Sequence, residues 1–294
     1  MINFGGIDAD YASWDASKVG ILPVPYDLTT SYRSGADNGP KAIIEASTQL
    51  ELYDEELKIE TYRIGITTMD ELKVRDLAPE EMLKSVYEAG LHLVKAGKFP
   101  VVLGGEHTVT IGMVKALMER YQDLSIVQFD AHADLRDEYE DRKFSHACVG
   151  RRLSELGQLL QLGVRSLSEE EAEIIPRTTV KTINAADIIR GLTPEEGSDP
   201  VISLIPTLSD PTYITIDLDV FDPSIMPSVG TPVPGGLGWY EMLDLLKYLS
   251  SVKEIVGFDV VELSPIPGNI APDFIAAKLV YRLLGYIFQR TENR

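Results

Sequence analysis

Residues 124–135 read LSIVQFDAHADL, an apolar run followed directly by three potential metal ligands at every second position. The run has the length and composition of a buried strand, and Asp130, His132 and Asp134 stand where that strand would end. A buried ionised carboxylate costs several kcal/mol unless something neutralises it. The stretch therefore predicts a buried strand that opens into a site where a cation offsets negative charge.

Similar runs alternate with helical patterns along all 294 residues. Segments such as 78–97 and 108–121 carry apolar residues at three- and four-residue spacing, and a last helical pattern spans 272–290. This alternation predicts one α/β domain over residues 1–294, with a mainly parallel sheet of about eight strands and helices on both faces. The predicted strands are residues 19–24, 62–67, 99–104, 124–129, 157–164, 178–183, 212–217 and 254–261.

Composition narrows the class of protein. The chain has 46 acidic and 27 basic residues and a formal net charge of −19, which argues against nucleic-acid binding and is compatible with a small cationic substrate or simply a highly soluble surface. The single cysteine, Cys148, excludes an internal disulfide, and we expect it to be a small buried side chain. No run is long and apolar enough for a membrane span, and the start lacks a secretory signal, so we expect a cytoplasmic protein.

Potential ligands follow three of the predicted strands. His107 comes after a strand and a Gly-Gly turn, and Asp217 and Asp219 end the run TYITIDLD. The carboxyl ends of parallel strands share one edge of a sheet, where ligands gather. One motif alone would be an ordinary turn or helix cap, but three at strand ends predict a metal site. The predicted ligands are His107, Asp130, His132, Asp134, Asp217 and Asp219.

The charge of this set suggests two metals. Four carboxylates within a few ångströms would repel one another, and two divalent cations cancel them. Oxygen ligands outnumber nitrogen and no thiolate is present, which favours Mn²⁺ and leaves Co²⁺, Ni²⁺ or Zn²⁺ as alternatives.

Four motifs resemble the signatures of the ureohydrolase family, which includes arginase and agmatinase. They are GGEH (104–107), DAHAD (130–134), SHAC (145–148) and DLDVFDPSIMPSVGTPVPGGL (217–237), and the resemblance runs from 23–43 through 257–265 to the final helix. The sequences of SHAC and of DLTTSYRSG (27–35) resemble those of agmatinases more than those of arginases. The resemblance implies a three-layer α/β/α fold with eight parallel strands, a binuclear manganese centre, hydrolysis of a guanidino group to urea and an amine, and a homotrimer or homohexamer.

The resemblance also implies a division of ligands. One metal would be held by His107, Asp130, Asp134 and Asp217, and the other by Asp130, His132, Asp217 and Asp219, so that Asp130 and Asp217 bridge the pair.

Three residues are expected to carry the catalysis. Asp134 would orient the attacking water and accept its proton, and Glu262 would pair with the guanidinium nitrogens of the substrate. His146 would bind near the substrate and protonate the leaving amine, although a purely structural role at a helix start stays open. Glu106, where the family commonly has Asp, precedes a ligand, and we expect it to act only indirectly.

The loop KFSHACVG (143–150) bears on the substrate. Arginases commonly carry an SGNxHG-type loop that binds the α-carboxylate, whereas Phe144 and Ser145 precede His146 here. This departure predicts a substrate without that carboxylate, with agmatine first, giving putrescine and urea. Aminopropylagmatine, guanidinobutyrate, guanidinopropionate, guanidine and arginine remain alternatives.

Two other classes compete with this interpretation. A mono-zinc amide deacetylase of the same architecture would need histidine pairs and fewer carboxylates, and a non-catalytic relative would not need every ligand together with His146 and Glu262. His92 lies in a helical pattern away from any predicted strand end, and we expect no chemistry from it.

Overall fold

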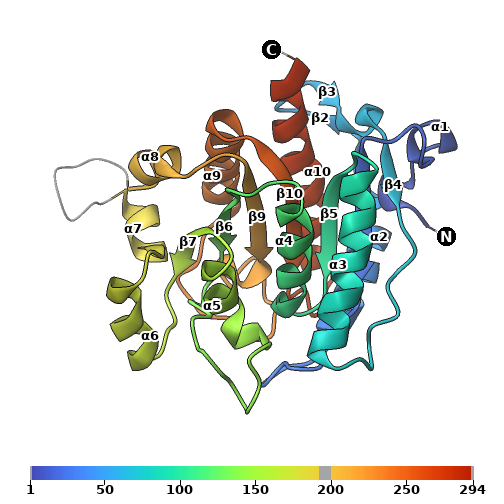
Figure 1. The fold of residues 1–294 in the computed structure, drawn as a ribbon. Coiled ribbons are helices and arrows are strands. Elements are labelled where there is room, and N and C mark those ends of the chain that lie inside the picture. Colours follow the sequence, from blue (N-terminus) through green and yellow to red (C-terminus); the bar gives the residue numbers. More distant parts are fainter. Residues whose placement is uncertain (1, 192–199, 293–294) are drawn as a thin grey trace.

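The computed structural model describes residues 2–191 and 200–292, and its centre is an eight-stranded sheet in the order β4-β1-β5-β10-β9-β6-β7-β8 (Figure 1). Every strand pair in this sheet is parallel, which confirms the predicted α/β class. The strands are β1 (Val19–Val24), β4 (Ile66–Thr68), β5 (Phe99–Gly104), β6 (Ser125–Phe129), β7 (Gln158–Val164), β8 (Lys181–Asn184), β9 (Thr212–Asp217) and β10 (Ile255–Val261).

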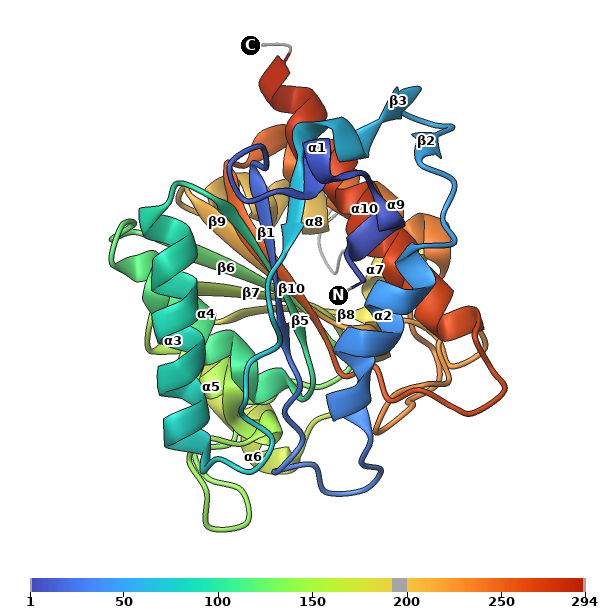
Figure 2. The same ribbon diagram turned by 90° about the vertical axis from the view of Figure 1, so that its right-hand side faces the viewer.

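Helices cover both faces of the sheet, so the chain forms three layers (Figure 2). On one face lie α3 (Pro79–Lys95), α4 (Thr110–Met118) and α5 (Val149–Ser154), and on the other lie α2 (Gly39–Ser47), α9 (Trp239–Val252) and α10 (Ala271–Glu292). The shorter helices are α1 (Ala9–Ala12), α6 (Glu169–Ile174), α7 (Ala185–Arg190) and α8 (Pro200–Leu204). Short 3₁₀ helices are η1 (Phe4–Gly6), η2 (Ala36–Asn38), η3 (Thr61–Ile64), η4 (His107–Val109), η5 (His146–Cys148), η6 (Ile175–Arg177), η7 (Ile205–Thr207) and η8 (Leu218–Val220).

Alternation along each strand builds two apolar layers. In β6, Ile126 belongs to the apolar cluster that includes residues of α3 and α4, whereas its neighbour Val127 belongs to the cluster of the opposite face. Both side chains are fully buried, as successive residues of a strand must be when helices cover both faces. In the described ranges, no helix is both long and apolar enough to cross a bilayer.

The predicted strand 62–67 is wrong at its first half. Residues 61–64 form the 3₁₀ helix η3, and β4 begins only at Ile66, after Gly65 with φ of 79°. The ring of Tyr62 packs edge-on against Tyr11, and its backbone N–H donates to the hydroxyl of Tyr281. These contacts with distant residues decide the local conformation over the β-forming composition of the run.

A second sheet, which the sequence did not predict, consists of β2 (Tyr53–Asp54) and β3 (Ile59–Glu60) paired antiparallel. Arg282 of α10 fixes it, because its Nε lies 2.6 Å from a carboxylate oxygen of Asp54. Both side chains are almost fully buried, so the ion pair ties this hairpin to the last helix.

The strand order brings four carboxyl ends together. Consecutive strands β5 and β6 do not pair, because β10 and β9 lie between them. The register aligns Val261 at the end of β10 with Asp217 of β9, and Phe129 at the end of β6 with Ile216. The residues that follow these strands therefore lie side by side at one edge of the sheet.

Candidate metal centre

His107 enters the site from a tight turn after β5. Gly105 accepts a hydrogen bond from Glu262 N at 2.7 Å, and its own N–H donates to Val24 O at 2.9 Å. A side chain at Gly105 would lie 2.0 Å from the backbone oxygen of Tyr26, so only glycine fits there. The turn delivers His107 to the start of η4 between the ends of β5 and β10.

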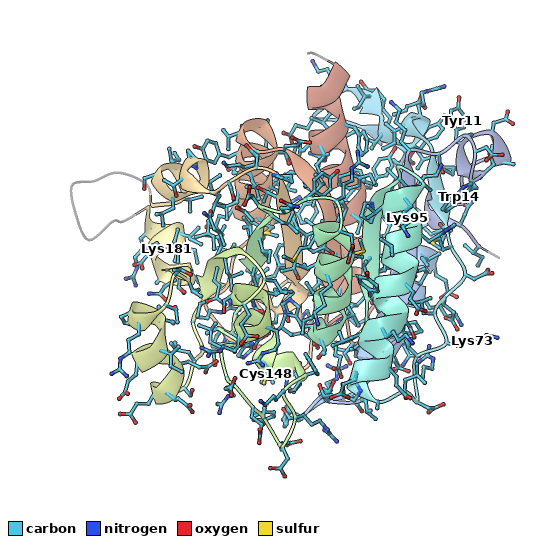
Figure 3. All side chains as sticks on the ribbon, in the orientation of Figure 1. Tyr11, Trp14, Lys73, Lys95, Cys148 and Lys181 are labelled. Atoms are coloured by element: carbon cyan, nitrogen blue, oxygen red, sulfur yellow. The ribbon has the colours of Figure 1, made fainter. Side chains whose placement is uncertain are left out.

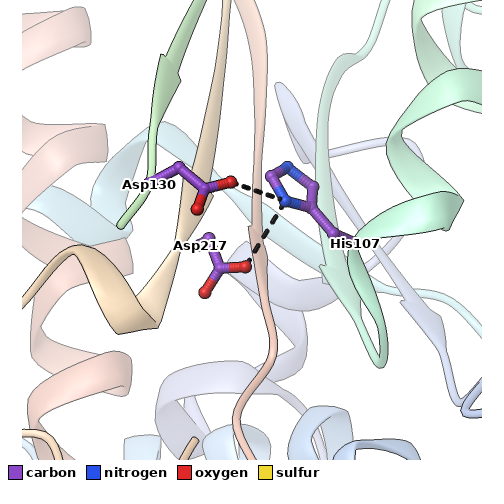
Figure 4. A group of neighbouring side chains, drawn as sticks. All are labelled: His107, Asp130 and Asp217. Carbon is purple, nitrogen blue, oxygen red and sulfur yellow. Dashed lines mark ion pairs between the residues drawn. The ribbon is translucent and has the colours of Figure 1, made fainter. Parts of the chain in front are cut away.

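The Nδ1 atom of His107 faces three carboxylates, and Figure 4 shows two of them, those of Asp130 and Asp217. It lies 3.1 Å from Asp130, 3.4 Å from Asp217 and 3.5 Å from Asp134. The side chain is fully buried, yet no described residue forms a hydrogen bond with Nδ1. A buried nitrogen with a lone pair, no hydrogen-bond partner and acidic neighbours is the environment that a bound cation would complete.

The other ring nitrogen of His107 is held by a buried network. Nε2 lies 2.8 Å from Thr215 Oγ1, and that hydroxyl donates to Asp259 at 2.6 Å. The hydrogen bond on Nε2 directs the lone pair of Nδ1 toward the carboxylates.

A second group lies next to the first. His132 Nδ1 is 2.8 Å from Asp219 and 3.7 Å from Asp130. Ligand atoms of Asp130, His132 and Asp219 lie within 4.8 Å of one another, as do those of His107, Asp130 and Asp217. Asp130 belongs to both groups, which is the position of a bridging carboxylate.

Backbone and side-chain donors orient these carboxylates. Asp130 accepts from Gln128 Nε2 at 2.8 Å and from His132 N at 2.6 Å. Asp219 accepts from Ala131 N at 2.9 Å and donates its own N–H to Asp217 at 2.8 Å. The second oxygens of Asp217 and Asp219 face the imidazoles of His107 and His132.

The crowding of the carboxylates shifts their pKa values. Burial and the nearby Asp130 raise the pKa of Asp134 to about 7, and burial together with Asp219 raises the pKa of Asp217 well above its ordinary value. Burial alone would also raise the pKa of Asp219, but His132 reverses the direction and lowers it. The carboxylates are too close to be ionised together without added positive charge.

The pKa values of the two imidazoles are raised as well, which favours their charged forms. Burial alone would lower their pKa values, but the carboxylates raise the pKa of His107 well above its ordinary value and that of His132 to about 10. The cluster attracts positive charge at both imidazoles, and its four carboxylates and two imidazoles fit a pair of divalent cations.

Asp134 and Glu262 adopt unusual backbone conformations at the site. Their φ angles are 51° and 67°, in the left-handed region that few side chains occupy. Glu262 Oε1 accepts from His107 N at 2.7 Å, and burial, followed by the nearby Glu106, raises the pKa of Glu262 well above its ordinary value. Both residues line the cavity above the cluster.

His146 lies at the rim of the same cavity. Its Nδ1 is 3.4 Å from Thr29 Oγ1 and its Nε2 is 3.4 Å from Ser31 Oγ. Burial and the nearby His132 lower the pKa of His146 to about 4. All the predicted site residues thus meet in one place, although they come from four separate strand ends and one loop.

The cavity measures about 280 Å³, which suits a small ligand. Several residues around it were missed by sequence reasoning, because the loops that carry them have no pattern of their own. They include Ser31, Tyr32 and Arg33 after β1, Arg136 and Tyr139 after the ligand-bearing loop, and Glu171 of α6. The segment 27–35 was noted only for its resemblance to agmatinases.

Two residues that could have suggested other chemistry lie elsewhere. Cys148 is buried before α5, and burial, with a smaller effect of Asp134, raises the pKa of its thiol to about 12 (Figure 3). His92 of α3 stacks on Trp14, with ring centroids 5.0 Å apart. Neither side chain lines the cavity that the described residues form over the cluster.

The chain resembles known proteins over nearly its full length. A model of the arginase family matches residues 17–285. The N(1)-aminopropylagmatine ureohydrolase of Synechocystis sp. is 40% identical over 281 residues, which cover 93% of this chain and 90% of that protein. The agmatinase of Pyrococcus horikoshii is 35% identical over 285 residues, covering 95% and 92%.

A solved structure has the same fold as this chain. The agmatine ureohydrolase of Thermoplasma volcanium superimposes with a TM-score of 0.84 at 32% identity, covering all of this chain and 96% of the other. These matches confirm the predicted resemblance to ureohydrolases of the agmatinase type. The chain therefore belongs to the arginase family, and it is a hydrolase that acts on amidino groups.

Proposed function

We propose that the protein hydrolyses the guanidino group of a polyamine precursor that lacks an α-carboxylate, with N(1)-aminopropylagmatine as the preferred substrate and agmatine as the second. Hydrolysis releases urea and leaves the corresponding amine, which is putrescine in the case of agmatine. The reaction uses the carboxylate cluster at the ends of β5, β10, β9 and β6.

The observation that carries the proposal is the orphaned Nδ1 of His107 among three carboxylates. Two Mn²⁺ ions would fit this donor set: His107, Asp130, Asp134 and Asp217 would hold one, and Asp130, His132, Asp217 and Asp219 would hold the other. Bound metals of this kind lower the pKa of a water ligand by several units, from about 15.7 toward 7 for zinc.

The protein side chains then position the substrate and move protons. One oxygen of Glu262 is occupied by His107 N, and the remaining oxygen can pair with a guanidinium N–H and hold the substrate carbon over the cluster. Asp134 lines the same cavity, where its carboxylate can orient the attacking water and take up the proton that the water loses.

His146 is the candidate for protonating the leaving amine. An amine leaves only after protonation, and His146 Nε2 faces Ser31 at the cavity. Burial, followed by the nearby His132, lowers the pKa of His146, so a proton that it receives is readily passed on.

The loop before His146 supports a substrate without a carboxylate. Phe144 packs toward Lys115 of α4, and Ser145 accepts from Ala147 N at 3.4 Å and caps η5. Neither side chain is among the described residues that line the cavity. Arg33 and Arg136 do line it, but Arg33 donates to Ser264 O and Arg136 lies over the ring of Tyr139.

The names of the relatives support the proposed order of the two substrates. The relative named for aminopropylagmatine is 40% identical, and the one named for agmatine is 35% identical. Sequence reasoning alone placed agmatine first, because the loop distinguishes substrates by their carboxylate and both candidates lack one. The tail beyond the guanidino group is therefore the feature to test.

The deciding experiment measures urea release by Mn²⁺-loaded protein on aminopropylagmatine, agmatine, guanidinobutyrate, guanidine and arginine. We expect kcat/KM to be highest for aminopropylagmatine, then agmatine, and at least about 100-fold lower for arginine, whose carboxylate would enter without a partner. A preference for arginine or guanidinobutyrate would overturn the substrate assignment. Absence of urea from every compound would overturn the reaction itself.

A further inference from the structure

Glu106 is a fully buried carboxylate that the reaction described above does not use. It stands between the Gly-Gly turn and His107, and its carboxylate is hydrogen-bonded to Thr29 in the loop after β1. Three donors converge on it: Thr29 N at 2.6 Å, Thr29 Oγ1 at 2.7 Å and Thr108 Oγ1 at 2.6 Å. A buried acid with this many dedicated donors is a built feature of the site.

Thr29 connects this carboxylate to His146. The backbone N–H of His146 donates to Thr29 Oγ1 at 3.2 Å, and His146 Nδ1 lies 3.4 Å from the same oxygen. Thr29 is 2% exposed, so water has little access to the hydroxyl. Three segments distant in sequence thus meet at one oxygen atom.

With Glu106 as a carboxylate, counting hydrogens at that oxygen gives one solution. A threonine hydroxyl has one hydrogen and two lone pairs. Its hydrogen is directed to Glu106, which makes the shortest of its contacts, and one lone pair accepts the backbone N–H of His146. The remaining lone pair can only accept, so His146 Nδ1 must carry a proton, and Nε2 is left facing Ser31 and the cavity.

We propose that Glu106 is a positioning residue that, through Thr29, keeps a proton on His146 Nδ1 and presents Nε2 to the substrate. The inference rests on the proposed function, in which His146 protonates the leaving amine. It assigns a role to the acidic residue of GGEH, for which the sequence predicted only an indirect effect. The arrangement is a carboxylate–hydroxyl–imidazole chain, in which the carboxylate fixes which nitrogen exchanges protons.

The variant Glu106→Gln reverses the direction of hydrogen-bond donation from Thr29 to residue 106, and its side chain has nearly the same shape as that of glutamate. The amide oxygen must face the N–H of Thr29, which leaves the amide NH₂ facing the Thr29 and Thr108 hydroxyls. The Thr29 hydroxyl then accepts from the amide and turns its hydrogen to His146 Nδ1. The proton of the neutral imidazole moves to Nε2.

The experiment reads this change directly by NMR. The full-length chain is labelled with ¹⁵N-histidine, loaded with Zn²⁺ as a diamagnetic metal, and multiple-bond ¹H–¹⁵N spectra report which nitrogen carries the proton. The chain has only four histidines, and the variant His146→Asn identifies the signal of His146. We expect the Nδ1–H form in the wild type and the Nε2–H form in Glu106→Gln, with the signal of His92 unchanged.

Thr29 supplies a matched pair of variants. Thr29→Ser keeps the hydroxyl and should keep the Nδ1–H form, whereas Thr29→Val has the same shape without the hydroxyl and should lose it. We expect kcat with Mn²⁺ to fall about 10-fold or more in Glu106→Gln and Thr29→Val, with KM changed much less, and to be retained in Thr29→Ser.

The outcomes separate this inference from the proposed function. An Nδ1–H form that persists in both Glu106→Gln and Thr29→Val would overturn the positioning role, whatever the activity. Full kcat in His146→Asn would instead overturn the catalytic role of His146 and leave the tautomer result standing. Should Glu106→Gln fail to fold, the Thr29 pair alone decides the question.

Discussion

At the scale of single residues, two acidic residues of the site have backbone conformations that non-glycine residues rarely adopt. Asp134 and Glu262 both have positive φ, and both line the cavity. The surrounding hydrogen bonds hold them there: Asp134 O accepts from Arg151 N at 2.9 Å, and Glu262 N donates to Gly105 O at 2.7 Å. Such strain, typically 1–3 kcal/mol for each residue, is tolerated where it aims a functional group.

A pH prediction follows from His146. Burial, with the nearby His132, lowers its pKa to about 4 in the folded chain, against about 6.5 in the unfolded chain. Between these values the unfolded state binds more protons, so the free energy of unfolding falls as the pH drops from about 6.5 toward 4. Without metal, the wild type should lose up to ~2 kcal/mol more than His146→Asn between pH 7 and pH 5.

Urea unfolding of both proteins at the two pH values, in the presence of a chelator, measures this difference. Equal losses in the wild type and in His146→Asn would show that His146 keeps an ordinary pKa in the folded chain.

At the scale of elements, the site depends on how β5 ends. The next residue is Gly105, and a Cβ atom at this position would lie 2.0 Å from the backbone oxygen of Tyr26. The backbone N–H and C=O of Gly105 are both hydrogen-bonded, so the turn cannot easily shift. We predict that Gly105→Ala lowers the free energy of unfolding by at least about 3 kcal/mol and weakens metal binding, because the turn that carries His107 must move.

Gly97 provides the matched control. It also follows an element, with φ of 70° after α3, but among the described residues other than its chain neighbours no atom lies within 4 Å of its Cβ position. Gly97→Ala should therefore cost only about 1 kcal/mol, the strain of the left-handed conformation. Urea unfolding and metal titration compare the two variants, and a cost at Gly105 no larger than at Gly97 would contradict the steric argument.

The predicted elements were most accurate where the environment of a run is uniform. Runs such as 99–104 and 212–217 are buried on both faces, and they form strands with the predicted limits. The run 62–67 is an edge segment, where contacts with Tyr11 and Tyr281 outweigh composition. The hairpin of β2 and β3 depends on Arg282, more than two hundred residues away, and no local pattern could have indicated it.

At the scale of the whole molecule, metal binding and folding are coupled. The four clustered carboxylates face one another only in the folded chain, so cations that bind there stabilise the fold. We predict that Mn²⁺ at 100 times its Kd raises the stability of the wild type by about 2.7 kcal/mol and its Tm by several degrees. The variants Asp130→Ala and Asp219→Ala should lose this response and their tight metal retention.

Calorimetry and metal analysis after gel filtration measure both quantities. His146→Asn serves as the control, because His146 belongs to neither ligand group and should retain the metal. An undiminished Tm shift in Asp130→Ala would contradict the ligand assignment, since Asp130 is shared by the two groups.

The sequence by itself determined the fold class and the chemistry of the site. Alternating strand and helix patterns require a parallel sheet covered on both faces, and acidic residues at the ends of buried runs require a compensating cation. Both conclusions follow from local composition, because a continuous run of apolar residues by itself indicates that the whole run is buried.

Only the tertiary structure decided how closely these residues approach one another and which loops join them. The order β5-β10-β9-β6 places Glu262 beside Asp217 and brings His107 to Asp130, although these residues are far apart in the chain. It also set the link from Glu106 through Thr29 to His146, which joins three loops. Distances of this kind depend on strand order and on loop packing, and both result from the free energy of the entire core rather than from any one segment.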